Sequence, residues 1–341
     1  MKSILVLDLE VYVNYTLLVF MNVKTRASRL FELPLSDDDR ATIKKIACSH
    51  RLITFNGSNY DIPLLMLILT GATSEKVKFA SDRIIVHGLK WWTFEQEFNV
   101  KCFPPALDHV DLMEIAPLTG SLKAYAARLH APSIQDLPID PSAVIVEEQK
   151  PILREYCQND CINTILLYNA LEQQIALREA MSETYGIDLK SKSDAQIAET
   201  VIKHECERIL GRKLDQPPEQ TGNSFAFTTP SWLSFKHLDI LDAVREAKFV
   251  VTDKGGVLLP DELKNRKIVI GDGVYRMGIG GLHSSEKTRV VKADGTKMIV
   301  DFDVASYYPS IVLNQGLFPK HIGQAFQTIY RKIVQRKRET K

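Results

Sequence analysis

The chain has 341 residues, of which 45% are hydrophobic and 25% charged, as is ordinary for a soluble globular protein. Its net charge of +1 carries no whole-chain signature of a nucleic-acid-binding protein. The longest apolar run, Leu64–Leu69, is far too short to cross a membrane. The apolar start Ile4–Leu7 is followed by acids, which excludes a signal peptide. We therefore expect a soluble, cytoplasmic protein, long enough for two domains.

The predicted elements begin with strands that alternate with helices, which favours an α/β layer fold. The first is Ser3–Val13, an apolar run broken by Asp8 and Glu10, typical of the central strand of a covered sheet. Its expected hairpin partner is Tyr15–Val23. The expected elements that follow are a strand over Leu52–Phe55, a helix beginning in Leu64–Leu69, a helix over Ser121–Leu129 capped by Ser121, and one long helix over Gln149–Ile175 with Pro151 in its first turn.

Beyond Arg178 the pattern changes, and we expect a domain boundary between residues 175 and 220. Three kinds of segment are predicted there: a helix over Ser193–Leu210, a loop or linker over Gln216–Pro230, and strands over Lys248–Val251 and Lys297–Val304, with a glycine-dense stretch at Gly271–Gly281 between the strands.

Charge and cysteines are unevenly placed. Residues 286–341 hold eleven basic and five acidic residues, a net +6, which leaves −5 for the rest of the chain. This asymmetry fits a basic end that faces phosphates and an acidic remainder that holds metal ions, and it fits a solvated basic helix equally well. The five cysteines have no zinc-type spacing and indicate a reducing compartment. Cys157 and Cys161, four apart on a predicted helix, are expected to be buried free thiols.

Several acids stand where acids are costly. Asp8 and Glu10 are two apart in a strand, so their side chains point to the same face. Burying both needs compensating cations, and the alternative is a strand end with solvated acids. Asp61 opens a helix, where an acid is often a simple cap. Asp160 shares a helix face with Tyr156 four residues earlier, and the alternative there is a surface pair.

In combination these residues resemble the three exonuclease motifs of the DEDD superfamily, tyrosine subgroup. The family patterns are Asp-x-Glu, Asn-x-x-x-(Phe/Tyr)-Asp and Tyr-x-x-x-Asp. They stand here without substitution as Asp8–Glu10, Asn56–Asp61 and Tyr156–Asp160. The resemblance implies an RNase H-like 3′–5′ exonuclease domain of the proofreading type, acting on DNA 3′ ends.

The resemblance also implies roles for the residues. Two divalent ions, Mg²⁺ or Mn²⁺, about 3.5–4 Å apart, would activate water and stabilise the leaving oxygen. Asp8 would bridge both ions, Glu10 and Asp160 would complete the site of the ion that activates water, and Asp61 would hold the second ion. Tyr156 would orient the attacking water, Phe55 and Asn56 would touch the terminal nucleotides, and Lys123 would contact a phosphate. For Lys123 a solvated helix lysine is an equally good interpretation.

A second motif lies at Asp303–Ser310. It resembles the first palm motif of family B DNA polymerases, Asp-x-x-Ser-Leu-Tyr-Pro-Ser, with Tyr307 in place of leucine. By resemblance Asp303 binds a metal ion, and the Ser-x-Tyr-Pro spacing selects it over Asp301, which shares its predicted strand face. The backbone at Ser306 and Tyr307 would cradle the incoming triphosphate, and Tyr308 would reject a ribose 2′-OH. Gly278–His283 resembles the glycine-rich connection between exonuclease and palm, without the tyrosine that usually leads it.

The remaining polymerase motifs do not follow, since no Asp-Thr-Asp occurs in the sequence and only the start of a basic fingers-like helix is expected over Tyr330–Lys341. We therefore expect this chain alone not to polymerise DNA. It would be either a fragment or one half of a split polymerase, whose second chain carries the missing motifs. The compact N-terminal layout looks like phage or mobile-element polymerases, which would place the protein in the host cytoplasm.

The sequence thus predicts an α/β protein in three parts. Residues 1–178 form the exonuclease domain, 179–285 a connecting region of uncertain fold, and 286–341 an incomplete polymerase palm region with the start of the fingers. The expected partners are a single-stranded DNA 3′ end or primer-template DNA. Two alternatives stay open: a scaffold or DNA-binding subunit of a split polymerase, and an RNase of the same superfamily.

Overall fold

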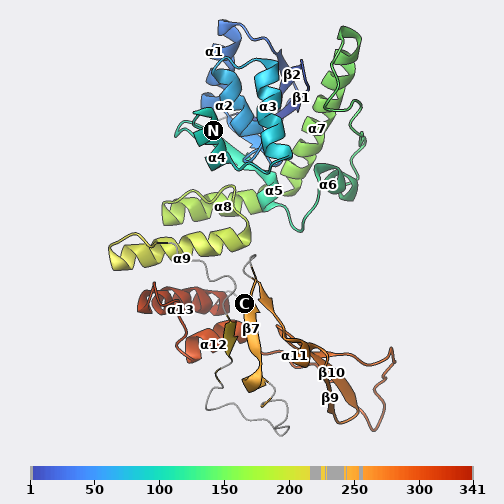
Figure 1. Cartoon of the computed structure of the whole chain (residues 1–341), viewed down its shortest axis with the longest axis vertical. Coiled ribbons are helices and arrows are strands. Elements are labelled where there is room, and N and C mark those ends of the chain that lie inside the picture. The colour runs from blue at the N-terminus through green and yellow to red at the C-terminus, as the bar shows by residue number, and fades with distance from the viewer. Residues whose placement is uncertain are drawn as a thin grey trace. The chain divides into compact units, whose positions relative to one another are not determined.

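The structure is a computed structural model that describes residues 3–215, 224–226, 228, 242, 244–252 and 256–339. The chain divides into two compact units, Met1–His204 and Glu205–Lys341, hereafter unit 1 and unit 2 (Figure 1). Within the described residues, no helix has the length and apolar character needed to cross a membrane.

Unit 1 is built on a five-stranded sheet in the order β3-β2-β1-β4-β5. β1 is the central strand, antiparallel to β2 and parallel to β4, as predicted for Ser3–Val13. β3 extends the antiparallel side and β5 the parallel side. The strands are β1 (Ile4–Val11), β2 (Thr16–Asn22), β3 (Ser28–Glu32), β4 (Arg51–Thr54) and β5 (Asp108–Asp111).

Alternation along β1 divides the core of unit 1 between the two faces of the sheet. Leu5, Leu7 and Leu9 pack into one apolar cluster with α1 (Asp37–Ser49), α2 (Asp61–Leu69), α3 (Ser74–Ile85) and α4 (Trp91–Phe98). Val6 joins a second cluster with α7 (Lys150–Ala170), on the opposite side of the strands in Figure 1. Asp8 and Glu10 have the parity of Val6, so they lie on the face that α7 covers. The α/β layer architecture is confirmed.

The helices that follow confirm one prediction and correct another. α6 (Leu122–Arg128) is capped by Ser121, whose hydroxyl accepts from the Ala124 backbone N–H at 3.2 Å. The single helix predicted over Gln149–Ile175 is wrong, because α7 ends at Ala170 and α8 (Glu172–Tyr185) begins after Leu171. Leu171 has φ −102° and ψ 10°, outside the helical range, while its side chain is buried in the second cluster. The remaining helices of this region are α5 (Leu112–Ile115) and α9 (Asp194–Leu210).

Unit 2 contains two three-stranded antiparallel sheets together with helices in its described part. β7 coincides with the strand predicted over Lys248–Val251. The predicted loop Gln216–Pro230 lies mostly outside the described residues, and its described part contains a strand, β6. The elements are β6 (Ser224–Ala226), β7 (Lys248–Val251), β8 (Val257–Leu258), α11 (Asp261–Lys264), β9 (Lys267–Ile270), β10 (Gly273–Gly278), β11 (Gly281–Ser284), α12 (Tyr307–Asn314) and α13 (Gln324–Glu339).

The strand predicted over Lys297–Val304 is not formed. Lys297 makes an isolated bridge with Asp294, and residues 298–304 have no regular structure. The apolar side chains that suggested the strand are exposed, with Phe302 at 89%. A strand in water needs a neighbour for its backbone groups and for its apolar face, and the described residues provide none for this segment.

Candidate functional site

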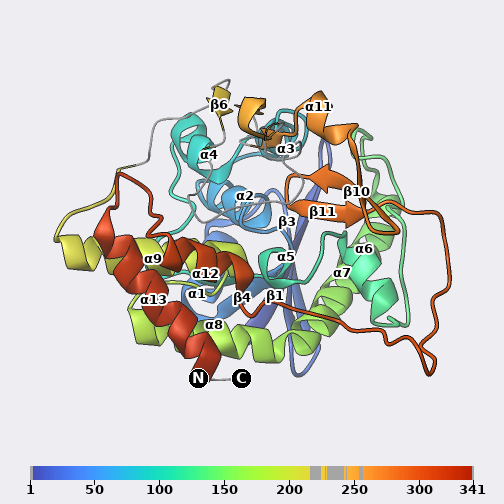
Figure 2. The ribbon, with the colours of Figure 1, turned by 90° about the horizontal axis from the view of Figure 1, so that it is seen from below.

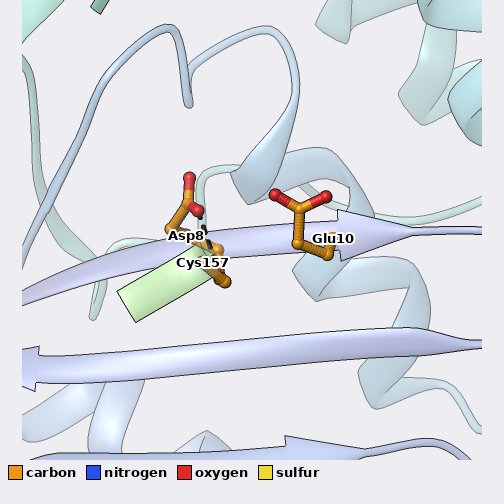
Figure 3. A group of neighbouring side chains, drawn as sticks. All are labelled: Asp8, Glu10 and Cys157. Atoms are coloured by element: carbon orange, nitrogen blue, oxygen red, sulfur yellow. Dashed lines mark hydrogen bonds between the residues drawn. The ribbon is translucent and has the colours of Figure 1, made fainter. Parts of the chain in front are cut away.

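The site begins on β1, where Asp8 and Glu10 project from the same face of the strand (Figure 3). Both carboxylates are half-buried. Cys157 reaches them from α7, and its thiol donates to Asp8 Oδ2 at 3.1 Å. One ligand atom from each of these three residues lies within 4.8 Å of the others, which is the spacing of a metal-binding group. The three could therefore hold a metal ion.

α7 adds the two other residues of its motif. Tyr156 is buried and Asp160 is half-buried, one helical turn further on. The proximity of Tyr156 lowers the pKa of Asp160, against the raising effect of burial. One oxygen of the Asp160 carboxylate, Oδ1, is buried and has no hydrogen-bond partner among the described residues. An acceptor buried without a partner costs roughly 1–3 kcal/mol, more when it is charged, so Asp160 is in place for a ligand that supplies positive charge.

Asp61 reaches the same place from the turn after β4. It is the first residue of α2 and only 4% exposed, with Tyr60 rather than Asp61 in the N-cap position. The turn depends on two residues of the second motif. Asn56 has φ 65°, the left-handed region that asparagine tolerates. At Gly57 a Cβ would lie 2.1 Å from Thr54 Oγ1, so only glycine fits there.

Asp111, at the end of β5, fixes this turn. Its carboxylate is buried and accepts hydrogen bonds from the backbone N–H groups of Asn56 and Ser58, both at 2.8 Å. The sequence reasoning missed Asp111. Its role follows from strand pairing, because β4 and β5 are parallel and the carboxyl ends of parallel strands meet at one edge of the sheet.

The pKa values show how closely the acids are gathered. Burial, and next the charge of Asp160, raises the pKa of Asp8 to about 7, against a hydrogen bond from Cys157. Burial raises the pKa of Glu10 well above its ordinary value, and the charges of Asp8, Asp160 and Asp61 raise it further. The pKa of Asp61 is likewise well above its ordinary value, through burial and then the charge of Asp8. The four acids, from β1, α2 and α7, therefore share one electrostatic environment.

Lys123 of α6 lies at the edge of this group. Its Nζ is 5.9 Å from the centre of the Tyr156 ring and 3.2 Å from Asp136 Oδ1. Its charge lowers the pKa of both Glu10 and Asp160, against the raising effect of burial. Phe55 lies near the same helix, with its ring centre 5.9 Å from that of Tyr125. Lys123 thus lies close enough to the acids to affect their pKa values, while the contact of Phe55 is with the ring of Tyr125.

The donor set suits a hard divalent cation. Carboxylate oxygens are the ligands that Mg²⁺ and Mn²⁺ prefer, and of the four acids Asp8 and Glu10 belong, with Cys157, to the group whose ligand atoms lie within 4.8 Å of one another. Cys157 adds a sulfur that the sequence reasoning expected only as a buried thiol. Burial raises the pKa of that thiol, so it remains protonated and serves Asp8 as a hydrogen-bond donor.

The residues of the polymerase-like motif belong to unit 2. Asp303 is exposed, and within the described ranges no group of three potential metal ligands forms around it. Ser306 has φ 51° and is the N-cap residue of α12. Tyr307 and Tyr308 are exposed, and the Tyr308 hydroxyl donates to the carbonyl of Gly280 at 3.1 Å. The palm-like motif and the glycine-rich segment therefore touch within unit 2.

The comparisons with known proteins leave the question of function to the site itself. No protein-family model matches this sequence, and no curated protein matches it. The residues that unit 1 brings together around β1 are therefore the evidence for its function.

Proposed function

We propose that unit 1 is a metal-dependent 3′–5′ exonuclease that removes nucleotides from DNA 3′ ends. One observation carries this proposal. Three segments far apart in the sequence bring together Asp8, Glu10, Asp61 and Asp160, whose charges act on one another's pKa values, with Tyr156 one helical turn before Asp160 on α7. Like charges gathered at partly buried positions destabilise the fold, and a bound cation would offset that cost.

An RNase H-like arrangement is part of the proposal. The support is the strand order β3-β2-β1-β4-β5, with an antiparallel β1–β2–β3 meander and parallel β4 and β5. This order places the middle of β1 beside the carboxyl end of β4, so that Asp8 on β1 lies near the turn that leads from β4 to Asp61.

When bound, two divalent ions would supply Lewis acidity to the attacking water and to the leaving 3′ oxygen. Asp8, Glu10, Asp61 and Asp160 would hold them. The Tyr156 hydroxyl would position the attacking water. Burial, and next the charge of Asp160, raises the pKa of Tyr156 above its ordinary value, so the hydroxyl keeps its proton and cannot act as a base at neutral pH.

The neighbouring residues would hold the strand. Lys123, beside the Tyr156 ring, carries the positive charge that a phosphate needs. Phe55 and Asn56, on the turn before Asp61, would contact the terminal nucleotides. The half-buried state of both side chains leaves part of each available to a ligand.

We also propose that unit 2 is the start of a family B polymerase palm, with Asp303 as its metal ligand and Tyr308 as its sugar-selective residue. The hydrogen bond from Tyr308 to Gly280 supports this, because it joins the two segments on which the resemblance depends. The expected compartment is the cytoplasm. Polymerisation would need the second chain or the missing segment.

The test is degradation of a 5′-labelled single-stranded oligodeoxynucleotide by the purified chain. With Mg²⁺ or Mn²⁺ the products should form a ladder that shortens from the 3′ end, and EDTA should abolish it. A matched oligoribonucleotide, run in parallel, separates DNA from RNA preference. Faster cleavage of the RNA would favour the RNase alternative, and a folded chain that cleaves neither strand would favour a scaffold.

A further inference from the structure

Unit 1 has a pocket of about 410 Å³ outside the acid group. It is lined by α4 with the residues before and after it, the turn between β4 and α2, α5, and the segment that leads from α8 into α9, elements labelled in Figure 2. Its lining includes two tryptophans, two lysines and two polar residues of the turn: Trp91, Trp92, Lys90, Lys192, Ser58 and Asn59.

The aromatic part of the pocket is built around Trp91. Its ring meets Phe103 and Trp92 edge-on, with ring centres 5.2 Å and 5.6 Å away. Trp92 is 53% exposed, although a tryptophan ring gains more than most side chains from burial. An exposed tryptophan beside a cavity is the arrangement that receives flat, π-faced ligands by stacking.

The charges around the pocket favour an anionic ligand. Lys90 is exposed and Lys192 half-buried, and neither Nζ has a carboxylate partner in the part of the chain that the structure describes. Glu114 also lines the pocket and offsets one of the two charges. A phosphate with an attached base satisfies both features, because the base stacks while the phosphate meets a lysine.

The pocket shares a wall with the acid group. Ser58 and Asn59 line the pocket, and Asp61, two residues later, is one of the four acids. Asp111 holds the Ser58 N–H and so fixes this wall. A strand whose 3′ end lies at the acids can therefore pass the turn and reach the pocket within a few nucleotides, since each nucleotide spans several ångströms.

We propose that this pocket receives an unpaired nucleobase of the single DNA strand whose 3′ end lies at the acid group. The base stacks on the Trp92 side of the pocket, and Lys192 and Lys90 contact the adjoining phosphates. This inference rests on the proposed function, because it takes the acid group as the place of the 3′ end.

The test is binding rather than cleavage. A series of 5′-fluorescein oligodeoxynucleotides is prepared, each with a single abasic residue at a different distance from the 3′ end. The affinity of the chain for each oligonucleotide is measured by fluorescence anisotropy in EDTA. For the wild-type chain, an abasic residue at one particular interior position should lower the affinity on the order of tenfold. Trp92→Ala should bind the intact strand on the order of tenfold more weakly. An abasic residue at that interior position should then cause no further loss of affinity. Phe79→Ala, which removes an exposed ring outside the pocket, is the matched control and should keep both the affinity and the penalty.

Lys192→Ala is the second variant, because it leaves the aromatic packing untouched. It should reduce the slope of the logarithm of affinity against the logarithm of salt concentration by about the amount expected for one phosphate contact. Equal abasic penalties at every interior position, or a Trp92→Ala chain that binds as Phe79→Ala does, would overturn the inference. Because no cleavage is needed, a chain that shows the position-specific penalty but never cleaves DNA would reject the exonuclease proposal and retain the pocket.

Discussion

Asp8 shows the cost of the site at the scale of one residue. Its pKa rises to about 7 in the fold, from 3.8 as the ordinary value. The folded chain therefore holds a proton that the unfolded chain releases, and the stability associated with Asp8 is present below pH 4 and is lost as pH rises towards 7. Metal ions bound at the acids would offset this loss.

We predict that thermal unfolding in EDTA occurs at a lower temperature at pH 8 than at pH 5.5, by several degrees. Other groups also titrate in this interval, so the measurement is the difference between wild type and Asp8→Asn. The variant should lose most of the pH-dependent difference and the stabilisation by Mn²⁺. A variant with the same pH dependence as wild type would show that the pKa of Asp8 is not raised in the fold.

Tyr156 offers a separate test, because its ring and hydroxyl have different roles. Tyr156→Phe keeps the buried ring and removes the group that would position water. We expect the turnover rate to fall on the order of 10²-fold, with little change in the affinity for DNA or metal ions. A rate that stays within twofold of wild type would remove Tyr156 from the reaction.

At the scale of the element, the turn between β4 and α2 is held by a strand that contributes no acid to the proposed reaction. Asp111→Ala would leave three partly buried backbone N–H groups, those of Asn56, Ser58 and Met113, without their acceptor, at a cost of about 2–4 kcal/mol in the free energy of unfolding. It should also reduce exonuclease activity, since Asp61 depends on the turn. The measurement is urea unfolding together with the turnover rate.

Asp111→Asn is the control for that prediction, because its amide oxygen can still accept part of these three hydrogen bonds. Stability and activity should both recover in part. Recovery of stability without any recovery of activity would mean that the charge of Asp111, which also raises the pKa of Asp61, matters more than the turn.

The local patterns in the sequence were enough for many elements and for the members of the acid group. The alternation in Ser3–Val13 predicted β1 as the central strand, and Ser121 predicted the start of α6. The break at Leu171 was not predictable, since it depends on how the helix packs against the sheet. The strand over Lys297–Val304 was predicted from apolar residues that find no partner strand. Asp111 was missed because its role follows from strand pairing, which no local pattern contains.

At the scale of the whole molecule, unit 1 ends at His204, beyond the exonuclease boundary predicted at residue 178. Contacts that join the α8–α9 region to the sheet explain the extension. Lys190 Nζ lies 2.6 Å from Asp108 Oδ1 of β5, and the Ser191 hydroxyl accepts from the Asp111 backbone N–H at 2.9 Å. The buried Arg178 also pairs with Asp194 at 2.6 Å.

We therefore expect a fragment of residues 1–210, which keeps α9 whole, to fold and to retain the activity of the full chain on single-stranded DNA. A fragment of residues 1–178 should be destabilised, because it lacks Lys190, one of the partners of Asp108, and Asp194, the partner of Arg178. Circular dichroism and the oligonucleotide assay would compare the two. Loss of activity in a well-folded 1–210 fragment would show that unit 2 takes part in binding the strand.

The most direct measurement compares wild type, Asp8→Asn and Asp38→Asn on one 5′-labelled single-stranded oligodeoxynucleotide with Mg²⁺. Asp38 is an exposed acid on α1, outside the acid group, so its variant controls for the loss of a charge. Wild type and Asp38→Asn should produce the same ladder from the 3′ end, while Asp8→Asn, folded by circular dichroism, should be slower by at least about 10³-fold. Equal ladders from all three proteins would contradict the claim that the acids around β1 form the nuclease site.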